Sequence, residues 1–160
     1  MTINTGKKTI ALALLALSAW SAAAQAGECP AGKEGKNALA GAPTQALGVT
    51  DSELAAVDLA KENVKLNERR LRLRHMTITA GGIVPLHSHA DRPALIKVDS
   101  GEIFEYSSKC TVPILHKAGE VSREFLGTMH YWKNVSDKPV ELTIGDIVND
   151  KKPDTMMKMM

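Results

Sequence analysis

The sequence lacks a marked excess of charge of either sign. Its 160 residues carry 20 Lys and Arg against 18 Asp and Glu. Removal of the N-terminal segment discussed below would take away two lysines and leave 18 charged residues of each sign. Such a balance argues against nucleic acid or an anionic membrane surface as the main partner. The run 69–74 is a local exception, and its alternation of arginine with leucine predicts a strand with one charged, solvated face.

The N-terminal apolar stretch, Ile10 to Trp20, lacks the length needed to span a bilayer comfortably. Two lysines precede it, and Ala24-Gln25-Ala26 follows it with the pattern that signal peptidase cleaves. Residues 1–26 are therefore predicted to be a signal peptide cleaved near Ala26. The rest of the chain would be periplasmic or secreted and would have no membrane contact. A membrane anchor or a buried first helix is the alternative.

Cysteine is scarce, and the sequence has no C-x-x-C motif, so a thioredoxin-type redox role has no support. The two cysteines are Cys29 and Cys110. An oxidising compartment favours a disulfide between them. Two separate thiols are the alternative.

The composition changes along the chain. Residues 27–50 are rich in Gly, Ala, Pro and Lys, which is typical of a flexible arm. Thr50-Asp51-Ser52-Glu53 has the spacing of a helix capping box, so a short helix is expected there. Residues 51–150 are predicted to form one domain. Residues 151–160 form a methionine-rich tail, expected to be a disordered end rather than a Cu(I) site.

Short segments rich in Val, Ile, Leu and Thr begin near Leu66 and are separated by Gly, Pro, Asn and Asp. They show no sustained helical period and no internal repeat. This pattern predicts an all-β antiparallel sandwich or barrel. The expected strands lie near 69–79, 84–88, 93–99, 102–107, 112–116, 120–125, 129–134 and 139–148.

Three histidines are candidate metal ligands. His87 and His89 are two residues apart, so in a strand they would face the same side and could converge on one ion. The H-x-H pattern alone is a weak signal. His130 lies in a second segment of similar design, with a glycine turn, an extended stretch and then a histidine among aromatic residues. Three histidines on two strands of one barrel would form a facial ligand set with open positions.

The spacing around these histidines resembles the two motifs of the cupin family. The first cupin motif is G-x5-H-x-H-x3–4-E-x6-G. The spacing here matches with Gly81, His87, His89 and Gly101, but Ala94 stands in place of the glutamate.

The second cupin motif is G-x5-P-x-G-x2-H-x3-N. Gly119, Gly127, His130 and Asn134 match it, with Phe125 in place of the proline. The resemblance covers roughly 80 residues and implies a small bacterial cupin of the type-2 conserved-barrel kind. Its expected fold is a double-stranded β-helix, or jelly-roll barrel. Cupins often pair, so a homodimer is an expectation from the family.

The missing glutamate leaves three hypotheses. The site could consist of three neutral imidazoles, could take a carboxylate from elsewhere, or could have lost its metal. Of the nearby acidic residues, Glu105 is the candidate substitute ligand, because it follows the first-motif strand and could point inward. Glu102 and Glu124 are expected to be ordinary edge charges.

The expected cofactor is a divalent transition metal, which could be Fe, Mn, Zn, Ni or Cu. The resemblance to three-histidine cupin dioxygenases implies a metal-dependent, dioxygenase-like enzyme acting on a small organic substrate in the barrel. The alternatives are a non-catalytic periplasmic binding protein for a small ligand or metal, and a metal-free interaction domain. Arg92 is a candidate clamp for a substrate carboxylate or a surface arginine, and Tyr106 and Trp132 are candidate pocket or core residues.

Overall fold

The computed structural model describes residues 28–37 and 39–152, so the predicted signal peptide and most of the methionine-rich tail lie outside the described residues. No helix in the described part of the chain is long and apolar enough to cross a bilayer. The described residues form eight strands, which confirms the predicted all-β class. The strands are β1 (Leu47–Asp58), β2 (Arg69–Ser88), β3 (Ala94–Ser100), β4 (Glu102–Ser107), β5 (Ile114–Lys117), β6 (Val121–Glu124), β7 (Met129–Lys133) and β8 (Val140–Asn149).

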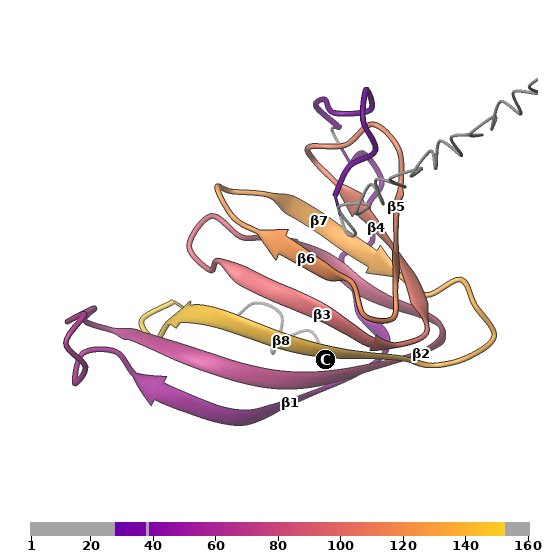
Figure 1. Cartoon of the computed structure of the whole chain (residues 1–160). Coiled ribbons are helices and arrows are strands. Elements are labelled where there is room, and N and C mark those ends of the chain that lie inside the picture. The colour runs from indigo at the N-terminus through magenta and orange to yellow at the C-terminus, as the bar shows by residue number, and fades with distance from the viewer. Residues whose placement is uncertain (1–27, 38, 153–160) are drawn as a thin grey trace, which may run out of the picture.

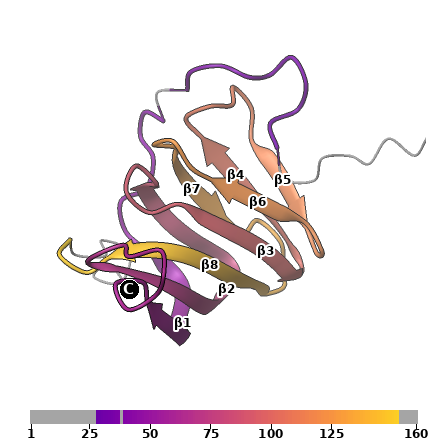
Figure 2. The same cartoon turned by 60° about the vertical axis from the view of Figure 1, so that its left-hand side comes forward.

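The strands form one antiparallel sheet in the order β5-β4-β7-β2-β8-β3-β6, and β1 adds to β2 outside this path. The sheet curls into a nearly closed barrel, with β1, β2 and β8 on one side and β4 and β5 on the other (Figures 1 and 2). Strands β5 and β6 are the two ends of the path. The barrel is therefore complete except for a seam between these two strands.

Strand β2 joins the two halves of the barrel. Its residues 70–83 pair with β1, residues 69–78 with β8, and residues 83–88 with β7. The two strands expected at 69–79 and 84–88 are therefore one continuous strand. The backbone between these two segments requires glycine at two positions. Gly81 has φ +74°, which other residues rarely adopt, and a Cβ on Gly82 would lie 2.8 Å from the Thr79 carbonyl oxygen.

Alternating side chains fill the barrel from opposite walls. In β2 to β8 the inner positions are buried, and most of their neighbours along the strand are half-buried or exposed, whereas β1 has no buried residue. Asn134 fastens the end of the β7 segment, because its amide donates to the carbonyl oxygens of Ile78, Thr79 and Lys138. The apolar core consists of Met76, Ile78, Val84, Ala94, Ile96, Val98, Ile103, Trp132, Val140, Leu142 and Ile144.

The short helix expected at 50–53 is wrong, because these residues lie in the middle of β1. The capping-box spacing is a local preference, and tertiary contacts override it. Asp51 pairs with Arg74, and Glu53 lies 3.0 Å from Arg70, so acidic side chains that would have capped a helix fasten β1 to β2 instead.

The arginine-rich run 69–74 is a strand, as predicted, but its faces are opposite to the expected ones. Arg72 and Arg74 are only 2% exposed, whereas Leu71 and Leu73 are 47% and 42% exposed. Arg72 donates to both carboxylate oxygens of Asp146, at 3.0 and 2.9 Å. A buried acidic partner therefore makes the charged face the inner face.

A disulfide joins Cys29 to Cys110, whose Cα atoms lie 5.5 Å apart. The same N-terminal segment forms backbone hydrogen bonds with the chain after β4, from Gly35 to Lys109 at 3.1 Å and from Thr111 to Lys33 at 2.9 Å. The segment predicted as a flexible arm is thus placed beside β4 and β5 (Figure 2).

Removal of this disulfide should destabilise the protein markedly. The bond closes a loop with a sequence separation of 81, and the chain-entropy account gives about 4 kcal/mol for a loop of that size. We expect Cys29→Ser/Cys110→Ser to lower the urea midpoint accordingly, as measured by circular dichroism. An unchanged midpoint would mean that the backbone hydrogen bonds hold the segment without the disulfide.

Candidate metal centre

The three motif histidines meet inside the barrel. His87 lies near the end of β2, directly opposite His130 on β7. His89 follows β2, and its backbone N–H donates to the Thr128 carbonyl at 2.8 Å, which continues the pairing past the strand end. All three side chains are buried. The i, i+2 spacing and the β2–β7 register together bring the rings to one point.

The three Nε2 atoms form a nearly equilateral triangle. The distance from His87 to His89 is 3.1 Å, and both distances to His130 are 3.0 Å. The ring centroids lie 4.5–5.0 Å apart, so only the Nε2 edges converge.

Hydrogen bonds on the opposite ring nitrogens fix the protons of these imidazoles. Nδ1 of His87 lies 2.8 Å from the Pro85 carbonyl oxygen, and Nδ1 of His89 lies 2.6 Å from that of Arg92. A carbonyl oxygen can only accept, so each Nδ1 carries the proton and each Nε2 presents a lone pair.

The same reasoning applies to His130, whose Nδ1 lies 3.0 Å from a carboxylate oxygen of Glu105. The indole Nε1 of Trp132 also lies 3.1 Å from this Nδ1. The carboxylate requires Nδ1 to donate a hydrogen bond, whereas the indole N–H requires Nδ1 to accept one. The contact with the ionised carboxylate is the stronger of the two, because its bond to an N–H is charge-assisted, so Nδ1 carries the proton. His130 therefore also directs an Nε2 lone pair into the triangle.

A divalent cation fits this donor set. Three lone pairs at 3.0–3.1 Å repel one another unless a positive charge lies between them. Nitrogens about 2.1 Å from an ion lie about 3.0 Å apart at right angles and about 3.4 Å apart in a tetrahedron. The triangle therefore suits three neighbouring positions of a six-coordinate ion better than a tetrahedral zinc site.

The surroundings keep the imidazoles neutral, as metal ligands must be. Burial, together with the charges of His130 and His89, holds the pKa of His87 well below its ordinary value. Burial and the charge of His130 lower the pKa of His89 to about 3.

Glu105 lies behind His130 rather than at the triangle. It points inward, and its carboxylate accepts from Nδ1 of His130 at 3.0 Å and from Nε2 of His116 at 2.9 Å. Burial raises its pKa, but the two hydrogen bonds outweigh burial and lower the pKa to about 2. An ionised carboxylate in this place orients a ligand imidazole and strengthens it as a donor. His116 is buried and donates to this carboxylate.

The expectation that Glu124 is an edge charge is wrong, because the residue is 2% exposed. It lies on β6 as the cross-strand partner of Ala94, so a buried carboxylate lies one strand away from the glutamate position of the motif. Its Oε1 accepts from Ser122 at 2.6 Å and lies 3.5 Å from Nδ1 of His130. Burial raises its pKa. No sequence signal identifies it, because the alternation in Val121-Ser122-Arg123-Glu124 would favour burial of the face that carries Val121 rather than the one that carries Glu124.

The three candidate substrate-binding residues lie in different places. The Arg92 guanidinium is 3.7 Å from Asp146, and its backbone carbonyl accepts from His89. Trp132 is buried between His130 and His116. Its ring stacks on the ring of His116 and meets that of His130 edge to face. Tyr106 lies on the face of β4 opposite Glu105 and stacks on Tyr131 at 4.5 Å.

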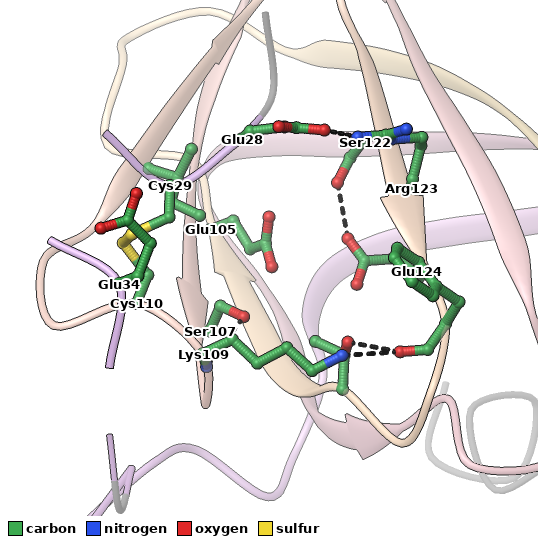
Figure 3. A pocket seen from close by; sticks show the side chains of 13 residues that line it. Glu28, Cys29, Glu34, Glu105, Ser107, Lys109, Cys110, Ser122, Arg123 and Glu124 are labelled. Atoms are coloured by element: carbon green, nitrogen blue, oxygen red, sulfur yellow. Dashed lines mark hydrogen bonds and ion pairs between the residues drawn. A yellow bond between two sulfur atoms is a disulfide. The ribbon is translucent and has the colours of Figure 1, made fainter. Parts of the chain in front are cut away.

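Two cavities lie near the candidate site, and His130 lines neither of them. A cavity of about 20 Å³ lies against His87, His89 and Trp132. A larger pocket of about 390 Å³ opens at the barrel seam, and the three motif histidines do not line it. Figure 3 shows Glu105 and Glu124 pointing into this pocket, with the disulfide on one side. The carboxylates therefore lie on the Nδ1 side of His130, away from the Nε2 triangle.

Solved structures match the chain, although no family model and no curated protein does. A predicted oxalate decarboxylase from Thermotoga maritima aligns with a TM-score of 0.51 and 19% identity, over 68% of this chain and 94% of that one. KdgF from Halomonas sp. aligns with a TM-score of 0.50 and 16% identity, over 68% and 84% of the two chains. The Cnp3 cupin domain of Schizosaccharomyces pombe aligns with a TM-score of 0.50 and 15% identity, over 66% and 67%. These likenesses show the cupin fold, as the motifs predict, and at this identity they show the fold alone.

Removing the carboxylate behind His130 should weaken metal binding without removing a ligand. We expect Glu105→Gln to lower the affinity for Co²⁺ by roughly 10–100-fold, because the His130 imidazole loses its charged acceptor. A chelator competition titration measures this. The matched control is Glu102→Gln on the exposed side of the same strand, which should leave the affinity unchanged. Equal affinities for the two variants would contradict the role of Glu105.

The metal-free protein should lose stability as the pH falls. Unfolded imidazoles take up a proton near pH 6.5, whereas folded His89 does so only near pH 3, and burial also holds the pKa of folded His87 well below its ordinary value. The unfolded state therefore binds more protons below pH 6.5, and two histidines together should cost about 2–3 kcal/mol between pH 6 and pH 5. Urea unfolding in the presence of a chelator measures this slope. His87→Ala/His89→Ala should flatten it, and an equally steep slope in that variant would contradict the assignment.

Proposed function

We propose that the protein is a cupin that binds one divalent transition-metal ion through His87, His89 and His130. The observation that carries this proposal is the convergence of three Nε2 lone pairs at 3.0–3.1 Å, each fixed by an acceptor on the opposite nitrogen. A cupin that had lost its metal would have no reason to keep three unprotonated nitrogens pointing at one another. This argues against the metal-free interaction domain.

The right-angled ligand set favours ions that accept six-coordination, such as Fe(II), Mn(II) or Ni(II). When bound, such an ion would supply a Lewis acid and, for iron, a centre for O₂ chemistry. The chain's own residues hold three neutral imidazoles in place, keep the ionised Glu105 behind one of them, and surround the centre with apolar side chains.

Catalysis on an organic substrate stays a prediction. The cavity against His87 and His89 has about 20 Å³, which is room for one water molecule. A dioxygenase-like reaction would need space for both substrate and O₂. The geometry therefore supports a metal-binding function first and an organic-substrate oxygenase second.

We also propose that the protein works in an oxidising compartment, as the predicted signal peptide implies. The Cys29–Cys110 disulfide supports this, because such bonds persist mainly in exported proteins.

The metal centre can be tested by metal content and spectroscopy. We expect the purified protein to bind one equivalent of Co²⁺ with the weak visible absorption of a six-coordinate ion. His87→Ala/His89→Ala and His130→Ala should lose more affinity than the roughly 100-fold typical of removing an outer partner. His75→Ala is the matched control, because His75 pairs with Glu141 on the protein surface. Equal metal contents in all four proteins would contradict the proposal.

A further inference from the structure

The small cavity beside the triangle is lined by three polar residues and otherwise by apolar side chains. Its polar lining consists of His87, His89 and Arg74, and the remaining lining is apolar and includes Met76 and Ile96. A cavity of about 20 Å³ has room for a single water-sized molecule or ion. It borders His87 and His89, whose Nε2 atoms form two corners of the triangle.

Arg74, which lines the cavity, also has an unused hydrogen-bond donor. Its side chain is buried, and its terminal nitrogens pair with Asp51 and, at 3.3 Å, with Asp146. Its Nε is buried and has no hydrogen-bond partner among the described residues. Buried guanidinium N–H groups are otherwise almost always satisfied, so this donor indicates a ligand that the protein atoms do not supply.

The charges around the cavity favour a negatively charged ligand. Three neutral imidazoles do not cancel the charge of a divalent ion, and the motif position that would supply a carboxylate is Ala94. The buried Asp146 already pairs with Arg72 and Arg74. Glu105 and Glu124 lie on the other side of His130 and line the larger pocket instead.

We infer that the open position of the metal centre takes one small anion, such as hydroxide, which the Nε–H of Arg74 holds from the opposite side. The apolar wall around it excludes organic carboxylates. This inference rests on the proposed metal centre and specifies the class of ligand that the centre accepts. Arg74 is then a residue that both positions the anion and selects it.

Fluoride is the probe of choice, because it is a monatomic anion of the size of hydroxide, and acetate is the organic comparison. In the Co²⁺-loaded protein, titration with fluoride should change the visible spectrum at concentrations at least about tenfold lower than titration with acetate. Arg74→Lys keeps the positive charge but lacks the Nε–H, and it should weaken fluoride binding at least about tenfold, as expected for a lost charge-assisted hydrogen bond. The fluoride titration of Arg74→Lys is done at a Co²⁺ concentration that saturates the variant, so that the comparison reports anion binding alone.

Arg72→Lys is the matched control. Arg72 lies two residues away on the same strand, is equally buried and also pairs with Asp146, but it does not line the cavity. It should leave fluoride binding unchanged. Ile96→Ala enlarges the cavity and should allow acetate to bind, whereas Val98→Ala, which is buried elsewhere on β3, should not. The two alanine variants test the size limit independently if a lysine variant fails to fold.

The outcomes separate the two proposals. A wild-type protein that binds no Co²⁺ would overturn the metal centre and the anion site with it. A protein that binds Co²⁺ but takes acetate as readily as fluoride, or loses no fluoride affinity in Arg74→Lys, would overturn the anion site and leave the metal centre standing.

Discussion

The hydrogen bonds on the Nδ1 atoms of the three histidines are the constraint on which the site depends. Two backbone carbonyls, of Pro85 and Arg92, and one carboxylate, of Glu105, hold the protons on the far side of the rings. The near side is then left with three lone pairs, which is a favourable arrangement only around a cation. Because two of the three acceptors belong to the backbone, the β2 conformation and the loop after it fix the ligand geometry as much as the side chains do.

The position of negative charge follows from the same arrangement. Glu105 contacts Nδ1 of His130 and would act on an ion in the triangle through the His130 ring, and Glu124 lies on that same Nδ1 side. A carboxylate behind an imidazole makes the nitrogen a stronger donor but leaves the ion's charge largely uncancelled. Ala94 in place of the motif glutamate would therefore change the electrostatics of the proposed centre without removing any of its three imidazole donors. This explains how three histidines can stay preorganised in a chain that has the cupin fold but lacks the glutamate of the cupin motif.

The motif residues could be predicted from the sequence because each meets a local requirement of backbone conformation or strand spacing. Gly81, Gly101, Gly119 and Gly127 all have positive φ, which glycine adopts without strain, and the spacing of the histidines follows from strand periodicity.

The orientation of 69–74 could not be predicted, since the alternation of arginine and leucine is the same whichever face points inward. Only Asp146, more than 70 residues away, makes the arginine face the buried one. For the same reason the strand at Leu47–Asp58 looked like a helix start, because its acidic residues find their partners on β2.

His130 divides the barrel into two environments with different chemistry. On its Nε2 side a cavity for one water-sized ligand is lined by apolar side chains and by Arg74. On its Nδ1 side a pocket of about 390 Å³ at the seam contains Glu105 and Glu124 and is bordered by the disulfide. A cation held by the three histidines and the Arg74 side chain on the lining of the cavity would both favour an anion there, whereas Glu105 and Glu124 lie next to Nδ1 of His130. The His130 ring thus separates the carboxylates of Glu105 and Glu124, which could neutralise a bound metal, from the small cavity in which such a metal could bind an anion.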